Sequence, residues 1–159
     1  MLRLALALAL VAGCRISLEP EPDAGAGRGC VVNMASPSCV DAVSHSDLTW
    51  IENNIFKSSC NFSGCHGSAT DLGKLDLSTG SQPRLVNVAS GLQPSRKLVV
   101  PNDIHASYLM LMVHDFTPDL ATPAGSAPPG GFMPKSQGLL CCQKLDAMER
   151  WIMAGAPAN

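Results

Sequence analysis

Aromatic residues are scarce in this chain of 159 residues, at 4% of the composition. Charged residues are also few, with 11 Lys and Arg against 13 Asp and Glu, and the formal net charge is −2. Without an excess of positive charge, the chain lacks the broad cationic surface that neutralises a row of nucleic-acid phosphates. Nucleic-acid binding is therefore disfavoured, and the shortage of aromatic side chains leaves room for a non-protein group in the interior.

The sequence also lacks the motifs of common enzyme classes. No Ser, His and Asp arrangement, no pair of carboxylates and no glycine-rich phosphate loop after a strand stands out. The chain is therefore not predicted to be an enzyme. Its length suits one domain of ordinary size with an appendage.

The first residues have the layout of an export signal. Arg3 supplies a positive charge, and residues 4–12 form an apolar run that is too short to span a bilayer. The run Val11-Ala12-Gly13-Cys14 resembles the lipobox of bacterial lipoproteins, which implies removal of residues 1–13 and a lipid on the Cys14 sulfur. A plain secretory signal cleaved near a cysteine is the alternative.

Three regions follow from this interpretation. Residues 1–13 are the signal peptide, residues 14–43 are a lipid-anchored tether and a lead-in that contains cysteine, and residues 44–159 are the folded domain. We expect the lipid to hold the protein in the bacterial cell envelope, in the periplasm or at the outer membrane. Arg15, directly after the lipidated cysteine, favours the outer membrane.

Hydrophobic periodicity predicts three helices in the domain. The first begins near Ser44 or Ser46 and runs to about Ser58, and the second covers residues 106–114, of which residues 108–113 are apolar on every face. The third is the clearest, because residues 141, 145, 148 and 152 form one apolar stripe before Gly155 and Pro157. A long Pro- and Gly-rich loop, residues 117–138, separates the last two helices.

The segment after the first helix, Cys60 to Gly67, carries the chemistry. Covalent c-type haem needs two cysteines followed at once by histidine, because the thiols add to the porphyrin vinyl groups and the imidazole binds iron. Here Cys65 and His66 are adjacent, but four residues separate Cys60 from Cys65 where the common motif has two. The additional residues have to bulge outward, which Ser63 and Gly64 allow.

Two other interpretations of these residues stay open at this point. A disulfide between Cys60 and Cys65 suits an exported protein in an oxidising compartment. A structural zinc ion held by Cys60, Cys65, His66 and either Cys141 or Cys142 also suits the spacing.

A loop methionine supports the haem interpretation. An electron-carrying haem needs a sixth ligand, and a thioether sulfur raises its reduction potential. Met133 stands in the sequence Gly130-Gly131-Phe132-Met133-Pro134, which has no helical stripe for the methionine to belong to. Glycines let the backbone approach a flat ring closely, and proline stiffens the turn. Histidine is the less favoured alternative for this position, from among His45, His105 and His114.

Four further side chains could lie near a haem. Arg96 and Lys97 could contact its propionates, although a solvated pair is the more common role for such neighbours. Trp151 and Tyr108 are expected to pack against the porphyrin or, failing that, against the protein core.

Residues from about Trp50 to Ala156 resemble the small cytochrome c domains found in planctomycetes and myxobacteria. Relatives usually have glycine where Asn102 stands. The matching stretches are Ile55-Phe56, Cys65-His66-Gly67, Leu75-Asp76-Leu77-Ser78, Leu98-Val99-Val100-Pro101, Ser107-Tyr108-Leu109, Met133-Pro134, Trp151-Ile152 and Gly155-Ala156.

The resemblance implies an all-α, class I cytochrome c-like fold, with three main helices and long irregular loops around one covalent haem c. It further implies that Cys60 and Cys65 are the thioether sites, His66 the proximal ligand and Met133 the distal ligand. The expected function is electron transfer to and from redox partner proteins. The alternatives are a zinc- or disulfide-stabilised lipoprotein without a redox role, and a binding module of a larger envelope assembly.

Four cysteines remain once Cys14 carries lipid and two others carry haem. Adjacent cysteines rarely bond to each other, so Cys141 and Cys142 are expected to find partners elsewhere in the chain. Of the three connectivities, the two that join Cys30 and Cys39 to the last helix are preferred, because they would brace a small domain. A buried free thiol is the alternative for each.

Overall fold

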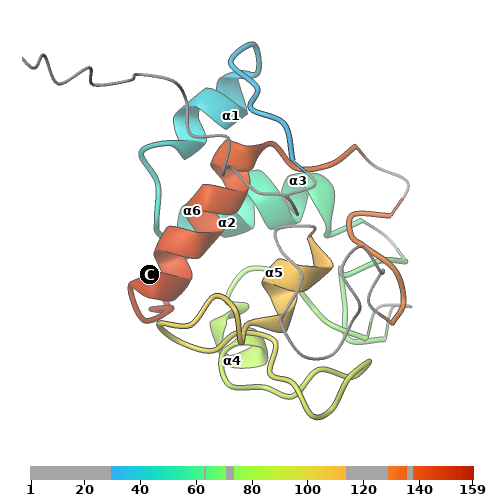
Figure 1. The fold of residues 1–159 in the computed structure, drawn as a ribbon. Coiled ribbons are helices and arrows are strands. Elements are labelled where there is room, and N and C mark those ends of the chain that lie inside the picture. The colour runs from blue at the N-terminus through green and yellow to red at the C-terminus, as the bar shows by residue number, and fades with distance from the viewer. Residues whose placement is uncertain (1–29, 63, 71–73, 114–128, 136–137) are drawn as a thin grey trace, which may run out of the picture.

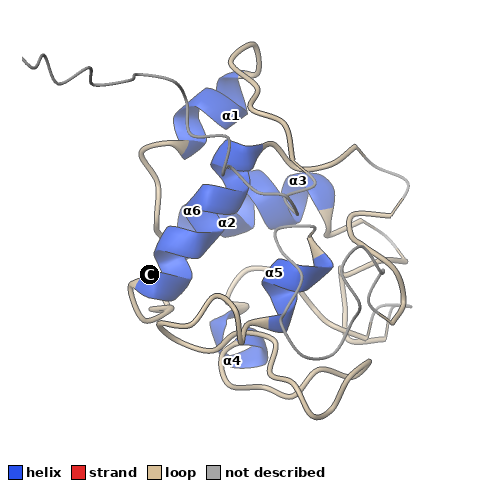
Figure 2. Ribbon diagram, viewed as in Figure 1, coloured by secondary structure: helices blue, strands red, loops and turns tan. Residues whose placement is uncertain are grey.

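The computed structural model describes residues 30–62, 64–70, 74–113, 129–135 and 138–159 (Figure 1). Within these ranges the regular structure is helical, and β pairing is limited to isolated bridges such as that between Val86 and Val99 (Figure 2). The expectation of an all-α protein agrees with this secondary structure. None of the helices in the described ranges is long and apolar enough to cross a membrane.

Helix α1, Pro37–Ala42, lies in the lead-in, where no helix was predicted. Proline is well placed at its start, since the first turn needs no amide donor and proline already has the helical φ. The helix buries Cys39 and Ala42. Its end is held by the Arg150 guanidinium, which donates to the Ala42 carbonyl at 2.7 Å and to the His45 carbonyl at 2.8 Å.

The first predicted helix is present as one run of three elements. They are α2, Leu48–Ile51, the π-helical turn η1, Glu52–Phe56, and α3, Lys57–Ser59. The predicted cap was wrong, because Asp47 begins the helix and its carboxylate accepts from the Trp50 amide at 2.8 Å. An aspartate at this position satisfies one of the free amides of the first turn.

In the π turn the backbone hydrogen bonds span five residues where an α-helix has four, and side chains donate to some of the carbonyls. Asn54 donates its side-chain amide to the Trp50 carbonyl at 3.0 Å. The Asn54 carbonyl in turn accepts from the Lys144 ammonium at 2.8 Å, so the last helix is tied to the first. Single-turn π bulges often occur at functional segments, and this one lies one helical turn before Cys60.

Helix α4, Gln82–Leu85, was not predicted, and residues 86–101 after it form turns and isolated bridges. The buried Glu52 carboxylate fixes the start of α4, accepting from the Gly80 amide at 3.1 Å and the Ser81 amide at 2.7 Å. The Ser81 hydroxyl donates to the same carboxylate at 2.8 Å. These donors offset the cost of burying the carboxylate.

Helix α5, Tyr108–Met112, is shorter than the predicted second helix, and all five of its side chains are buried. The burial agrees with the prediction from its apolar residues. Asn102, in the turn before it, has a φ of 62°. That left-handed conformation favours glycine, and asparagine is one of the few other residues that adopt it readily.

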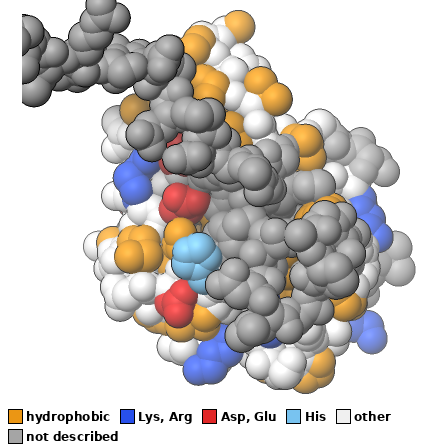
Figure 3. Space-filling view, in the orientation of Figure 1, with side chains coloured by type: hydrophobic (Ala, Val, Ile, Leu, Met, Phe, Trp, Pro, Cys, Tyr) orange, Lys and Arg blue, Asp and Glu red, His pale blue; other side chains and the backbone are white. Residues whose placement is uncertain are grey.

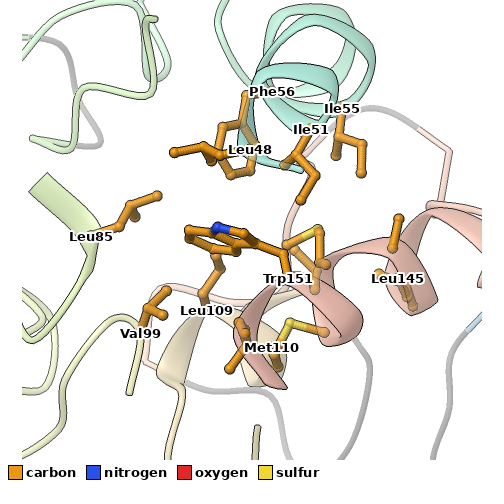
Figure 4. Close-up of a cluster of buried hydrophobic side chains, with 14 of the residues drawn as sticks. Leu48, Ile51, Ile55, Phe56, Leu85, Val99, Leu109, Met110, Leu145 and Trp151 are labelled. Carbon is orange, nitrogen blue, oxygen red and sulfur yellow. The ribbon is translucent and has the colours of Figure 1, made fainter. Parts of the chain in front are cut away.

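Helix α6, Cys142–Met153, confirms the third predicted helix. Its Trp151 lies at the centre of the core, surrounded by apolar side chains from α2, α4 and α5 (Figure 4). The indole nitrogen donates to the Pro157 carbonyl at 2.8 Å, so its one polar atom is satisfied. The structure therefore places Trp151 within the protein core, the second of the two positions expected from the sequence.

Two disulfides join the lead-in to the start of α6. Cys30 is bonded to Cys142 and Cys39 to Cys141. This is one of the two connectivities favoured from the sequence. The bonds close loops of more than 100 residues, so they restrict the unfolded chain strongly.

Truncation of Leu145, which is completely buried in α6, should create a cavity in the core. We expect Leu145→Ala to lower the free energy of unfolding by about 2–5 kcal/mol in a chemical denaturation experiment. Met153→Ala on the same helix is the control, because Met153 is 52% exposed and its truncation should change stability by less than about 0.5 kcal/mol. Equal effects of the two substitutions would contradict the packing of α6.

Candidate functional site

His66 is held by the segment that follows it in the chain. The backbone carbonyl of His66 accepts from the Leu77 amide at 2.9 Å, and its ring Nδ1 lies 3.0 Å from the Leu75 carbonyl oxygen. The side chain is half-buried. Both the backbone and the ring of His66 are therefore positioned by residues 75–77.

The contact with Leu75 determines which ring nitrogen carries the proton. A carbonyl oxygen only accepts hydrogen bonds, so Nδ1 must be the donor in this contact. In the neutral ring, Nε2 then keeps its lone pair and is free to bind a metal. Histidine ligands in proteins are commonly oriented by such a bond from the other ring nitrogen.

Cys60 and Cys65 are free thiols in two different environments. Cys60 follows α3 and packs against the hydrophobic core, whereas Cys65 is exposed and its amide donates to the Phe62 carbonyl at 2.9 Å. Burial raises the pKa of the Cys60 thiol to about 12, although the nearby Lys144 ammonium opposes the shift. The segment thus presents two unbonded thiols followed directly by an oriented imidazole.

Met133 approaches the core from a separate segment. Its amide donates to the Met112 carbonyl at the end of α5 at 2.6 Å, and its side chain packs against the core cluster. Gly130 has a φ of 88°, and a β-carbon there would come within 2.9 Å of the Leu92 side chain. Glycine is therefore favoured in this turn by its backbone conformation.

The structure places Cys60 and Met133 at the edge of the same apolar cluster. In the view of Figure 1, the segment after α3 and the segment with Met133 both lie to the right of α5. The rest of the loop before Met133, residues 114–128, lies outside the described residues, as does Ser63 in the spacer between the two cysteines.

A group of buried polar atoms was not identified from the sequence. The Gln93 amide oxygen, the Arg96 Nη1 and the Tyr108 hydroxyl are all buried and have no hydrogen-bond partner. Tyr108 is 1% exposed, and burial raises the pKa of its phenol while the Arg96 charge opposes this. The backbone brings these side chains together, because the Tyr108 amide donates to the Lys97 carbonyl at 3.0 Å.

Such unpartnered atoms are costly. A buried polar group without a partner costs about 1–3 kcal/mol, and a charged one costs more. A guanidinium and a phenol side by side are both donors, and they match an acidic oxygen acceptor. From the sequence, Arg96 was expected to be a solvated residue or a propionate contact, and Tyr108 a packing residue. That the two side chains come together was not predicted.

Several alternatives for the site are corrected by the structure. The Cys60–Cys65 disulfide is not formed, because both thiols are free. The zinc site with Cys141 or Cys142 as a ligand is wrong, since both sulfurs are in disulfides.

The histidines proposed as alternatives to Met133 lie in other settings. His45 stacks on Trp50 with ring centroids 4.7 Å apart, and its nitrogens lie 3.1 Å from Asp47 and 3.5 Å from Asp41. Its ring nitrogens therefore already face carboxylates. His105 is exposed in the turn before α5, and His114 lies outside the described residues.

Comparison of the chain with protein-family models, with curated proteins and with solved structures gave no match. The described part of the chain also contains no cluster of three or more His, Cys, Asp or Glu side chains able to hold a metal ion. A haem iron does not need such a cluster, because the porphyrin supplies four nitrogens and the protein supplies one or two axial ligands.

The different environments of the two thiols predict different reactivity. In the haem-free protein at pH 8, iodoacetamide should alkylate the exposed Cys65 well before Cys60, because only a small fraction of Cys60 is thiolate below its pKa of about 12. Mass mapping of peptides after timed alkylation measures both rates. Denatured protein is the control, in which the two rates should converge; faster alkylation of Cys60 in the native protein would contradict this environment.

Proposed function

We propose that this protein is a lipid-anchored, monohaem c-type cytochrome that transfers single electrons. In this proposal Cys60 and Cys65 form the thioether bonds, His66 is the proximal iron ligand and Met133 is the distal ligand. The observation that carries the proposal is the hydrogen bond of His66 Nδ1 to the Leu75 carbonyl, beside two free thiols. The bond orients the ring as a ligand, and the two free thiols are available for thioether bonds.

The residues near Tyr108 offer a test of whether haem suits this chain. Haem c carries two propionate groups, and the Arg96 guanidinium and Tyr108 hydroxyl are buried donors without an acceptor. A propionate bound between them would satisfy both and would balance the arginine charge. The Gln93 amide, turned over, would add a third donor. The polar atoms present therefore fit the group.

Bound haem would supply iron that gains or loses one electron. The protein would hold the iron through two side chains: Leu75 keeps the His66 ring in one tautomer for binding, and the Met133 thioether would raise the reduction potential. With both axial positions filled, no substrate could reach the iron. The proposed activity is therefore electron transfer between protein partners, without catalysis.

The lipid on Cys14 would keep this activity at the cell envelope, in the periplasm or at the outer membrane. A second function, a disulfide-braced lipoprotein without a redox role, is favoured by the two disulfides that join the lead-in to α6. Only the first function requires covalent haem, which makes the two separable by experiment.

Covalent haem should be found when the full chain is exported from a host with cytochrome c maturation machinery. Denatured protein should stain for haem, and its intact mass should exceed that of the lipidated chain by one haem. We expect Cys65→Ala to reduce attachment and His66→Ala to abolish the native spectrum, whereas His105→Ala, at an exposed histidine, should leave both unchanged. Colourless wild-type protein with the mass of the bare lipidated chain would refute the function.

Replacement of Met133 separates the distal ligand from the attachment site. Met133→Ala should remove the far-red absorption band of sulfur bound to ferric iron and should lower the reduction potential, because the thioether favours the ferrous state. Spectroscopy and a potentiometric titration measure the two effects. Met34→Ala is the matched control, since Met34 is 70% exposed. An unchanged spectrum in Met133→Ala would assign the sixth ligand to another residue.

A further inference from the structure

Exposed apolar side chains are concentrated at one end of the molecule. The four most exposed large apolar side chains of the described residues are Val31, Met34, Val32 and Val43, at 72%, 70%, 62% and 59%. All four belong to the short lead-in before the domain. Figure 3 shows hydrophobic side chains gathered over α1 and the chain that enters it. We name this surface the apolar face and define it as Val31, Val32, Met34, Val40, Val43 and Leu139.

The apolar face includes a group of side chains around a hollow and a pair at the end of α1. Val31, Val32 and Leu139 line one hollow of about 430 Å³ beside the Cys39–Cys141 disulfide. Val40 and Val43 are three residues apart on and just after α1, so they lie on the same side of the helix. Exposed apolar surface of this extent is unfavourable in water and commonly marks a site of contact.

The small number of charges on the apolar face indicates which kind of partner it can contact. Between Cys30 and Val43 the only charged residue is Asp41, and the one charged residue among the described lining of the hollow is Lys144, whose ammonium donates to the Asn54 carbonyl. A partner recognised by charge is therefore disfavoured. A zwitterionic lipid surface matches an apolar, nearly uncharged face, because side chains such as valine and methionine gain free energy when they leave water.

The chain between the lipidation site and the apolar face limits how far that face can lie from the membrane. Cys30 is fixed to α6 by its disulfide to Cys142, and the chain before it connects to Cys14, the lipidation site of the proposed function. Even fully extended, the residues between Cys14 and Cys30 could not reach beyond about 55 Å. The point where this chain joins the domain therefore stays within about 55 Å of the membrane, and the apolar face adjoins that point.

We propose that the apolar face docks on the lipid bilayer that holds the Cys14 lipid. This inference rests on the lipid anchor of the proposed function and does not depend on haem. Docking gives the anchored domain a preferred orientation, with α1 toward the membrane and α4, which lies at the opposite end in Figure 1, away from it. Redox partners would then approach from the side that faces away from the lipid.

Photo-cross-linking to lipid tests this orientation in the full, lipidated chain. The protein is reconstituted into phosphatidylcholine vesicles that contain phosphatidylcholine with a diazirine in the acyl chain, and the cross-linked peptides are mapped by mass spectrometry. We expect cross-links at residues 31–43 and at Leu139. Cross-links spread evenly over the exposed apolar residues, including Leu92 and Met153, would overturn the proposal, as would their absence from the apolar face.

Matched variants separate docking from anchoring. Val31→Ser with Val32→Ser should reduce the lead-in cross-links several-fold, and these exposed side chains can change without disturbing the backbone bond from the Cys142 amide to the Val31 carbonyl. Val88→Ser with Met153→Ser is the control and should leave the yield unchanged. Protein-to-protein cross-links between two lead-ins would instead assign the face to a second copy and overturn lipid docking.

Intact mass and haem staining of the same sample keep the outcomes distinct. A chain without lipid on Cys14 would refute the anchor, and a chain without haem would refute the electron-transfer function. A lipidated chain whose apolar face is not cross-linked to lipid would refute only the docking proposal.

Discussion

The hydrogen bond between His66 Nδ1 and the Leu75 carbonyl is the interaction on which the proposed site depends. Without it the imidazole could turn, and either nitrogen could carry the proton. The bond requires residues 75–77 to pass beside His66, and the Leu77 amide donating to the His66 carbonyl holds them there. An irregular segment with little secondary structure thus orients the one side chain from which the proposed chemistry would begin.

Buried polar contacts and apolar packing join the helices around that segment. Glu52 binds the start of α4, and Lys144 joins α6 to the π turn just before Cys60. Trp151 fills the space between α2, α4 and α5, where it is surrounded mainly by aliphatic side chains (Figure 4). In this arrangement the free Cys60 thiol and Met133 both lie at the edge of the core.

The two ends of the domain differ in character. At one end, the disulfides fasten the lead-in to α6 and leave valine and methionine side chains exposed. Toward α5, the Arg96 Nη1 atom and the Tyr108 hydroxyl are buried and lack partners. Exposed apolar groups and buried unpaired polar groups are both unfavourable in an isolated protein, and each becomes favourable with a suitable partner, a lipid surface for one and an acidic group for the other.

The sequence by itself determined the helices around Ile51 and Leu145, because apolar periodicity depends on local spacing, and it identified the adjacency of Cys65 and His66. It also indicated which cysteines could pair, but not which of the two favoured connectivities forms. The helices α1 and α4, the orientation of His66 and the burial of the Arg96 Nη1 atom were decided only by tertiary structure. Each of these depends on contacts between groups whose relative positions are set by packing, and local residue patterns do not encode such contacts.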